Sequence, residues 1–379
     1  MTESKYPYIP ERLSYEKIAQ IPVASPEMTV QERRQLCVDF FYFTNSFLWT
    51  PKENLDYVIK SSKAPRSLEV GRLYGGLCYD ACSSGNVYRI MDYYDPETGI
   101  LDLKTGYEKE YNFVTCQCSG GAHWSWARVQ CPAWFRGCSD MVVKNGCRKI
   151  GPYQYDPELE EFSEEYGTGH VCQENGKQVM FESYAQMQLA DCLVYFTTAG
   201  HVVMARSKPW VVRNEDGTID GDASHIFIVD QAQAWHHNPT KYGEEFFHMP
   251  NIRREITFNT LFDSAYIPVT IAAFDEDFKC ETPWLKINLS QPTVSVEDLK
   301  SAVVTSNYVI SDLYVIVEDD NGAELYKEVT RTEGLFKMSW SAEKAVDAEK
   351  LQTLSGKQVK ILCQSGSGIR EVVYSGKLQ

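Results

Sequence analysis

The sequence has no run of about eighteen apolar residues, the length that a helix needs to cross a membrane. We therefore expect no membrane span. The N-terminal stretch MTESKYPYIPERL has neither the basic region nor the apolar core of a signal peptide, so we expect none. No fixed-period repeat or low-complexity tract occurs in the sequence. These absences indicate a non-repetitive globular protein and leave its compartment open.

Positive charge is also scarce. The chain has 37 Lys and Arg against 52 Asp and Glu, a formal net charge of -15 at pH 7. A surface that binds phosphates would be basic, so we expect no nucleic acid partner. The 379 residues are 43% hydrophobic and 23% charged, which is typical of a soluble chain with one large or two ordinary domains.

Cysteine is abundant, with twelve residues, but the chain is long and shows no export signal. We therefore expect mostly reduced thiols rather than a disulfide framework. Several of these thiols are flanked by apolar residues and are expected to be buried as small hydrophobes: Cys37, Cys192, Cys280 and Cys363.

Capping and turn patterns predict the elements of the first half of the chain. TVQE at 29–32 has the pattern of a capping box and predicts a helix over residues 29–48. VYRIMDYYDPETGILDL predicts a hairpin with its turn at DPETG. Residues 120–129 are expected to be helical. The polar stretch 146–177 is expected to be an insertion or a long loop.

A dense β region follows, and its pattern then changes. The candidate strands are 192–197, 201–206, 210–214, 225–231 and 266–274, with a DG turn inside 214–222. From about residue 284 the short strands recur about ten residues apart, as in a small β-sandwich. The fold class is therefore α+β, with an all-β sandwich at the C-terminal end.

Cys118 is the strongest candidate for a chemical role. It precedes the small residues Ser119, Gly120 and Gly121, which allow a tight turn into a helix. A thiol at a helix N-terminus meets the positive end of the macrodipole and unpaired N–H groups. Both favour the thiolate, which is the nucleophile. The same amides can stabilise an oxyanion. This position suits a thiol nucleophile.

A thiol nucleophile needs a base and a residue that orients the base. His201 begins a predicted strand, directly after the strand LADCLVYF. The strand HIFIVDQ offers Asp230 and Gln231 near its end, and neighbouring strands can present such a pair across from each other. Asp230 and Gln231 face opposite sides, and the sequence leaves open which one orients His201.

The order of these motifs resembles the NlpC/P60 group of papain-like cysteine peptidases, to which the CHAP amidases are related. Tyr74-Gly75-Gly76 is similar to the YxWGG motif of that group, and Gln117-Cys118-Ser119-Gly120 is similar to its DCSG motif. Residues 189–196 are similar to LxPGDLVFF, and residues 200–204 to GHVGIY. The resemblance covers roughly residues 66–275.

The resemblance implies a papain-like fold in which a helix bearing the cysteine packs on an antiparallel sheet. It implies Cys118 as nucleophile, His201 as base and Asp230 or Gln231 as orienting residue, without a cofactor or a catalytic metal. Tyr74 would line the oxyanion site, together with Ser119 and Gly120. The implied reaction is hydrolysis of amide bonds in bacterial cell-wall stem peptides or related short peptides.

The chain departs from the family pattern at several places. Gln117 replaces the usual Asp, and Ala190 replaces a Gly. About forty residues separate Gly76 from Cys118, and 28 separate His201 from Asp230, more than the family usually has. These insertions would lie around the cleft, so the substrate is the least transferable inference.

Other interpretations of the same residues remain. Cys82 also precedes small residues and is a rival nucleophile, and Cys116 could be a redox partner of Cys118. His225 is a second candidate base. A structural zinc site could draw on thiols and a histidine, although their spacing fits poorly: Cys116, Cys118, Cys131, Cys138, Cys147, His170 and Cys172. A papain-like binding module without turnover is the alternative function.

The sequence therefore predicts three parts. Residues 1–65 form an N-terminal helical segment packed on the catalytic domain, residues 66–282 form that domain, and residues 283–379 form an immunoglobulin-like sandwich. The sandwich is expected to bind a polymer or another protein, because no catalytic pattern occurs in it. A peptidoglycan substrate would require a secreted or wall-associated protein, whereas another peptide would allow a cytoplasmic one.

Overall fold

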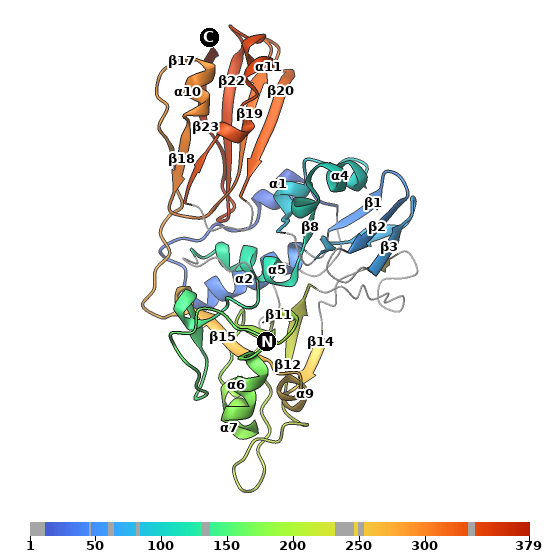
Figure 1. Ribbon diagram of the computed structural model, residues 1–379, viewed down its shortest axis with the longest axis vertical. Helices are drawn as coiled ribbons and strands as arrows, with labels where there is room; N and C mark the ends of the chain where they lie inside the picture. The colour runs from blue at the N-terminus through green and yellow to red at the C-terminus, as the bar shows by residue number, and fades with distance from the viewer. Residues whose placement is uncertain are drawn as a thin grey trace. The chain divides into compact units, whose positions relative to one another are not determined.

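The computed structural model describes residues 12–44, 47–59, 64–80, 84–130, 137–231, 246–248, 254–332 and 338–379. The fold is α+β, as predicted, and Figure 1 traces the chain. It divides into two compact units. The first is built from the described parts of 1–20, 28–126 and 133–278, and the second from 21–27, 127–132 and 279–379.

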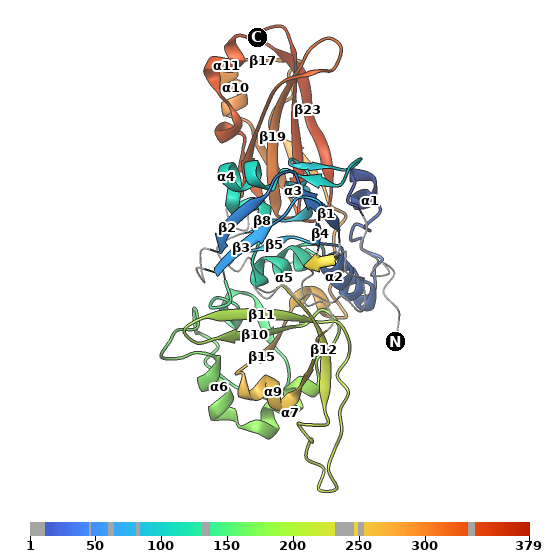
Figure 2. The same cartoon turned by 90° about the vertical axis from the view of Figure 1, so that its right-hand side faces the viewer.

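A six-stranded sheet organises the first unit (Figure 2). Every neighbouring pair in it is antiparallel. Its strands, in spatial order, are β14 (Arg254–Thr257), β12 (His225–Asp230), β11 (Gly200–Ala205), β10 (Cys192–Phe196), β15 (Ile267–Ile271) and β9 (Cys147–Lys149). Four of these are the strands predicted at 192–197, 201–206, 225–231 and 266–274. The stretch 210–214 is not a strand, since only isolated bridges join Trp210 to His225 and Arg213 to Ile219.

Helices cover both faces of this sheet (Figure 2). On one face lie α2 (Val30–Thr44) and α5 (Cys118–Ala127). On the other lie α6 (Thr168–Asn175), α7 (Lys177–Ala185) and α9 (Phe258–Asp263). Because both faces are covered, the apolar run at the start of β10 is fully buried rather than alternating.

Helix α2 begins as its capping box predicts. Thr29 and Glu32 exchange backbone and side-chain hydrogen bonds at the N-terminus of the helix. The helix ends at Thr44, earlier than predicted, because the chain enters strand β1 (Leu48–Pro51).

The rest of the first unit carries short elements. A five-stranded sheet has the order β13 (Phe246–His248), β4 (Leu73–Gly75), β1, β7 (Ile100–Leu101) and β6 (Tyr94–Asp95). Two further pairs are β2 (Leu55–Ile59) with β3 (Ala64–Leu68), and β5 (Cys78–Tyr79) with β8 (Thr115–Cys116). The remaining helices are α1 (Tyr15–Ala19), α3 (Val87–Ile90) and α4 (Leu103–Val114), with 3₁₀ turns η1 (Val143–Asn145) and η2 (Ala272–Phe274). The segment before residue 66 therefore contains strands as well as helices.

Two local predictions need correction. The hairpin at DPETG exists as β6 and β7, but VYRI before it is helix α3, because the Asn86 side chain caps it by accepting from the N–H groups of Tyr88 and Arg89. The polar stretch 146–177 is not all loop: it contributes strand β9 to the large sheet and contains helix α6.

The second unit is β-rich, as predicted for the C-terminal end. A five-stranded sheet has the order β17 (Thr293–Val294), β23 (Arg370–Leu378), β22 (Gln358–Ser365), β19 (Ile310–Glu318) and β20 (Glu324–Arg331). A three-stranded sheet has the order β16 (Leu285–Ile287), β18 (Val303–Ser306) and β21 (Ser339–Ser341). Two helices, α10 (Val296–Lys300) and α11 (Ala348–Gln352), and the 3₁₀ turn η3 (Glu343–Ala345) complete it. Side chains from both sheets form one core.

Among the helices that the structure describes, none combines the length and the apolar character that crossing a membrane requires.

Candidate active site

Cys118 is the first residue of helix α5. The carbonyl of Gln117 accepts the first helical hydrogen bond, from the Gly121 N–H at 3.0 Å. The N–H groups of Cys118, Ser119 and Gly120 therefore have no acceptor four residues earlier within the helix. They point toward the end of the helix at which negative charge is favoured.

Packing rather than helix propensity holds α5 in place. Its sequence, CSGGAHWSWA, contains two glycines, and its side chains are almost all buried. The indole N–H of Trp124 donates to the Ser84 carbonyl and that of Trp126 to the Ala190 carbonyl, each at 2.9 Å. A Cβ at Gly121 would lie 3.1 Å from the ring of Phe41 on α2. Glycine at this position thus lets the two helices approach closely.

His201 lies on strand β11, and the register of the sheet explains its position. Tyr195 of β10 pairs with His201, and Val203 of β11 pairs with Asp230 of β12. His201 and Val203 are two residues apart on one strand, so their side chains share a face with that of Asp230. Asp230 is consequently a diagonal neighbour of His201.

Asp230 is the carboxylate that contacts His201. Its Oδ1 lies 2.7 Å from Nε2 of His201, and the carboxylate is buried. With Nε2 engaged, Nδ1 is the ring nitrogen that remains for the thiol. The His201 side chain is 21% exposed, so the imidazole borders both the buried thiol and the solvent side of the site.

Gln231 has a different role from the one expected. Its Nε2 donates to the carbonyl of Leu77 at 3.0 Å and to that of Cys116 at 3.4 Å. The side chain therefore ties the end of β12 to the strands β5 and β8 that precede α5. Of the two candidates that the sequence left open, Asp230 is the one whose side chain contacts His201.

Cys118 and His201 shift each other's titration. A hydrogen bond from Cys138 holds the pKa of Cys118 well below its usual range, and the His201 charge and the Val202 N–H act in the same direction against burial. Burial lowers the pKa of His201, but the charges of Cys118 and Asp230 outweigh it and raise this pKa well above the usual range. Both directions favour a thiolate–imidazolium pair.

Cys138 is a site residue that sequence reasoning did not single out, because it was considered only as a zinc ligand. Its Sγ lies 4.0 Å from Sγ of Cys118, and both thiols are buried. The hydrogen bond to Cys118 raises the pKa of Cys138 well above the usual range, and burial adds to this effect. These directions favour a neutral Cys138 thiol beside a Cys118 thiolate.

Tyr79 is the tyrosine that interacts with Cys118. Burial raises the pKa of Tyr79, and the charge of Cys118 and a hydrogen bond with its side chain raise it further. Tyr74 instead accepts a hydrogen bond from the Glu69 N–H at 2.8 Å and stacks on Trp49. The spacing of the YGG motif gave no sign of this difference, since Tyr79 lies beyond that motif on strand β5.

Ala190 stands at the position where the similar motif has a glycine, and its backbone conformation is one that favours glycine. It has φ of 67°, in the left-handed region that glycine adopts without strain. Its N–H donates to Ala205 at 2.8 Å, and its carbonyl accepts from Trp126. This strained residue links the strand pair β10 and β11 to helix α5.

A pocket of about 490 Å³ opens beside His201. It is lined by the end of β10, the start of β11, the end of α9 and the segment after α9: Tyr195, Thr197, His201, Asp263, Ser264, Ala265 and Tyr266. The Tyr195 hydroxyl is hydrogen-bonded to Thr197 Oγ1 at 2.8 Å, which fixes one wall. Its size falls within the range of sites that bind small molecules or short peptides.

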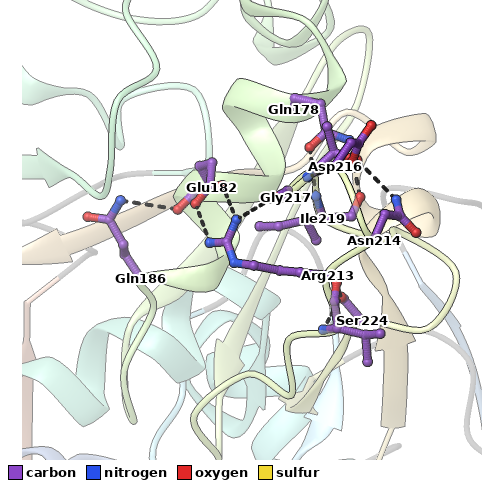
Figure 3. A network of polar contacts seen from close by, with 11 residues as sticks. Gln178, Glu182, Gln186, Arg213, Asn214, Asp216, Gly217, Ile219 and Ser224 are labelled. Carbon is purple, nitrogen blue, oxygen red and sulfur yellow. Dashed lines mark hydrogen bonds and ion pairs between the residues drawn. The ribbon is translucent and has the colours of Figure 1, made fainter.

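The connection between β11 and β12 is fixed on helix α7 by polar contacts (Figure 3). Arg213 makes a bidentate ion pair with Glu182, at 2.7 and 2.9 Å. The side chain of Gln178 exchanges two hydrogen bonds with the backbone of Ile219. These contacts attach the long segment between His201 and Asp230 to helix α7.

The structure also bears on the zinc site and on His225 as a base. Within the described ranges, no group of three or more His, Cys, Asp or Glu residues could hold a metal ion. The ring of His225 lies 3.3 Å from the carbonyl of Ala223 and 3.7 Å from the carboxylate of Glu255. Cys82 and Cys131 lie outside the described residues.

Cys116, considered as a redox partner of Cys118, donates instead to the Gln117 carbonyl at 3.4 Å. Burial raises the pKa of its thiol. Ser119 and Gly120 lie in the first turn of α5, as the sequence predicts. The thiol in hydrogen-bonding contact with Cys118 is that of Cys138.

Comparison of the chain with protein-family models and with curated proteins finds no match. The resemblance to the NlpC/P60 group is therefore a resemblance of sequence motifs.

Proposed function

We propose that this chain is a cysteine peptidase or amidase with a papain-like fold similar to the NlpC/P60 group. The observation that carries the proposal is the placement of three residues. Cys118 begins helix α5 beside His201, and His201 Nε2 is 2.7 Å from the buried carboxylate of Asp230. A nucleophile, a base and an orienting residue are the minimum for thiol acyl transfer.

In the proposed reaction, the Cys118 thiolate attacks the carbonyl carbon of an amide. His201 then donates its proton to the leaving amine, and the C–N bond breaks to give a thioester. His201, now neutral, takes a proton from water, and the resulting hydroxide attacks the thioester to release the acid. Asp230 stabilises the imidazolium and holds the ring so that one nitrogen faces the sulfur.

The oxyanion that forms during attack would be stabilised by two kinds of donor. The first N–H groups of helix α5, at Cys118 and Ser119, lie at the positive end of the helix. The Tyr79 hydroxyl lies within hydrogen-bonding reach of Cys118, and its raised pKa keeps it protonated as a donor. Tyr79 replaces Tyr74 in this role.

The pocket beside His201 supports a short peptide as substrate. His201 delivers the proton to the leaving amine, so the pocket that it borders would receive the leaving side of the amide. The family resemblance makes bacterial cell-wall stem peptides the first class to test. We further propose that the C-terminal β-rich unit is an immunoglobulin-like sandwich that binds a polymer or a protein.

The test is hydrolysis by the full chain. A pool of soluble stem peptides is incubated with the native protein and with Cys118→Ala, and new amines and acids are identified by mass spectrometry. We expect products with the native chain and a fall of at least about 10³-fold with the variant. Saturable binding of these peptides without turnover by the native chain would favour the binding-module alternative and contradict the proposal.

A further inference from the structure

Cys118 and Cys138 lie close together in space although twenty positions separate them in the chain. Their Sγ atoms are 4.0 Å apart. A disulfide needs about 2 Å between the sulfurs, so a shift of roughly 2 Å would join them. Cys138 lies in the short turn 137–141, which is closed by a hydrogen bond from the Gly137 N–H to Asp140 Oδ1 at 2.9 Å. A turn can make such a shift more easily than a strand in the sheet.

Gly200 creates the space that Cys138 occupies. A Cβ built at Gly200 would lie 2.8 Å from Cβ of Cys138 and 3.3 Å from its Sγ. Real Cβ atoms do not approach that closely, so any larger residue would displace Cys138. The residue directly before His201 thus permits the second thiol to reach Cys118.

Other thiols of the chain have different neighbours. Cys116 donates to the Gln117 carbonyl, Cys172 to the Tyr266 carbonyl at 3.6 Å, and Cys280 to the Val129 carbonyl at 3.4 Å. Each of these thiols donates a hydrogen bond to a backbone oxygen. Cys118 and Cys138 instead form a sulfur–sulfur contact at the candidate active site.

We propose that Cys118 and Cys138 form a reversible oxidation site, in which a hydroperoxide oxidises Cys118 and Cys138 resolves it as an intramolecular disulfide. That this oxidation would stop hydrolysis rests on the proposed function. Its chemistry requires only the two thiols and a hydroperoxide.

The chemistry balances in two steps. The Cys118 thiolate attacks the terminal oxygen of the hydroperoxide, the O–O bond breaks, and a proton from His201 completes the alcohol or water that leaves. Cys118 sulfur is oxidised by two electrons to sulfenic acid, and the peroxide is reduced. Cys138 sulfur then attacks Cys118 sulfur, and the S–O bond breaks. The oxygen leaves as water with the proton of the Cys138 thiol.

The disulfide would remove the nucleophile and protect it from irreversible oxidation. A sulfenic acid that is not resolved can proceed to sulfinic acid, which thiol reductants do not reverse. Cys138 is close enough to intercept it. A dithiol reductant should restore both thiols and, with them, hydrolysis.

The experiment treats the full chain with hydrogen peroxide, blocks free thiols, digests with trypsin without reduction and maps the peptides by mass spectrometry. We expect a cross-link between the tryptic peptide 110–128, which carries Cys116 and Cys118, and the peptide 137–144, which carries Cys138. The cross-link should persist in Cys116→Ala and disappear after treatment with a dithiol. In Cys138→Ala, dimedone should instead label a sulfenic acid at Cys118.

Gly200→Ala tests the geometry while keeping every thiol. It should slow formation of the cross-link relative to the native chain, because the new methyl group displaces Cys138. The matched control Cys172→Ala removes a buried thiol bonded to a carbonyl and should leave the cross-link unchanged. Circular dichroism and the melting temperature report whether each variant is folded.

Two outcomes would overturn the proposal: no cross-link in a folded native chain at any peroxide exposure that oxidises Cys118, or a cross-link from Cys118 to a thiol other than Cys138. Both readouts are independent of hydrolysis. If the cross-link forms but no amide is cleaved, the peptidase proposal fails while the oxidation site stands.

Discussion

Asp230 lies 2.7 Å from His201 Nε2, while Gln231, the next residue, contacts the backbone carbonyls of Leu77 and Cys116. The side chains of these adjacent residues thus contact different parts of the protein. Asp230 would control the charge of the imidazole, and Gln231 anchors the end of strand β12, which carries Asp230.

Asp230→Asn should lower the rate of hydrolysis by about 10²- to 10⁴-fold, because the imidazolium loses its buried counter-charge. The pKa of His201 should fall with it, since the carboxylate charge raises that pKa. Gln231→Leu is the matched control. It should lower the melting temperature, because the carbonyls of Leu77 and Cys116 each lose a donor, yet keep most of the activity per folded molecule. Equal loss of activity in the two variants would contradict the assignment.

Tyr79→Phe and Tyr74→Phe separate the two tyrosines. Tyr79→Phe should reduce kcat by about 10²- to 10³-fold with little effect on KM, because an oxyanion donor acts mainly in the transition state. Tyr74→Phe loses the hydrogen bond from the Glu69 N–H and should cost about 1 kcal/mol of stability without an effect on kcat. Steady-state kinetics and thermal unfolding distinguish these results, and the reverse pattern would return the oxyanion role to Tyr74.

The pH dependence of hydrolysis follows from the opposite pKa shifts of Cys118 and His201. Because the pKa of Cys118 is lowered, the thiolate persists below the pH of about 8.5 at which ordinary thiols titrate. Because the pKa of His201 is raised, the imidazolium persists above its usual range. Hydrolysis should therefore have a broad plateau at neutral pH. It should fall in acid as the thiolate is protonated, and in base as the imidazolium loses its proton.

Asp230→Asn should narrow that plateau from the basic side. The pKa of His201 falls in the variant, so the imidazolium is lost at a lower pH than in the native chain. A pH–rate profile of both proteins provides the measurement. An unchanged basic limb in the variant would show that the imidazolium of His201 does not control it.

Arg34→Met tests a buried ion pair at the start of strand β10. Arg34 donates to Asp191 at 2.7 Å and to the Leu189 carbonyl at 2.6 Å, and both side chains are largely buried. Removing the guanidinium would leave a buried carboxylate unpaired and should cost about 3–5 kcal/mol in the free energy of unfolding. Arg213→Met removes an exposed ion pair with Glu182 and should cost about 0–1 kcal/mol. Denaturant unfolding of both variants checks this ordering, and equal costs would contradict it.

The sequence was sufficient to predict the parts of the site that depend on local pattern. Cys118 followed by small residues predicts a helix N-terminus, and His201 at the start of an apolar run predicts a strand. The structure has both. The strands β10, β11, β12 and β15 were also predictable, because each has a buried apolar run.

The parts that depend on register and on distant loops were not predictable. The choice between Asp230 and Gln231 rests on the pairing of Val203 with Asp230, and a shift of one residue would reverse it. Cys138 reaches Cys118 from an irregular turn that has no periodic signal. VYRI was predicted as part of a hairpin because its apolar residues suit a strand, but the Asn86 cap makes it a helix.

The most direct test of the central claim is thiol mapping of the native protein with limiting iodoacetamide near pH 6. An ordinary thiol, with a pKa of about 8.5, is almost entirely protonated at this pH and reacts slowly. We predict selective labelling of Cys118 that is lost in His201→Ala and retained in His225→Ala. Labelling elsewhere in the chain, or labelling of Cys118 that survives removal of His201, would contradict an activated Cys118–His201 pair.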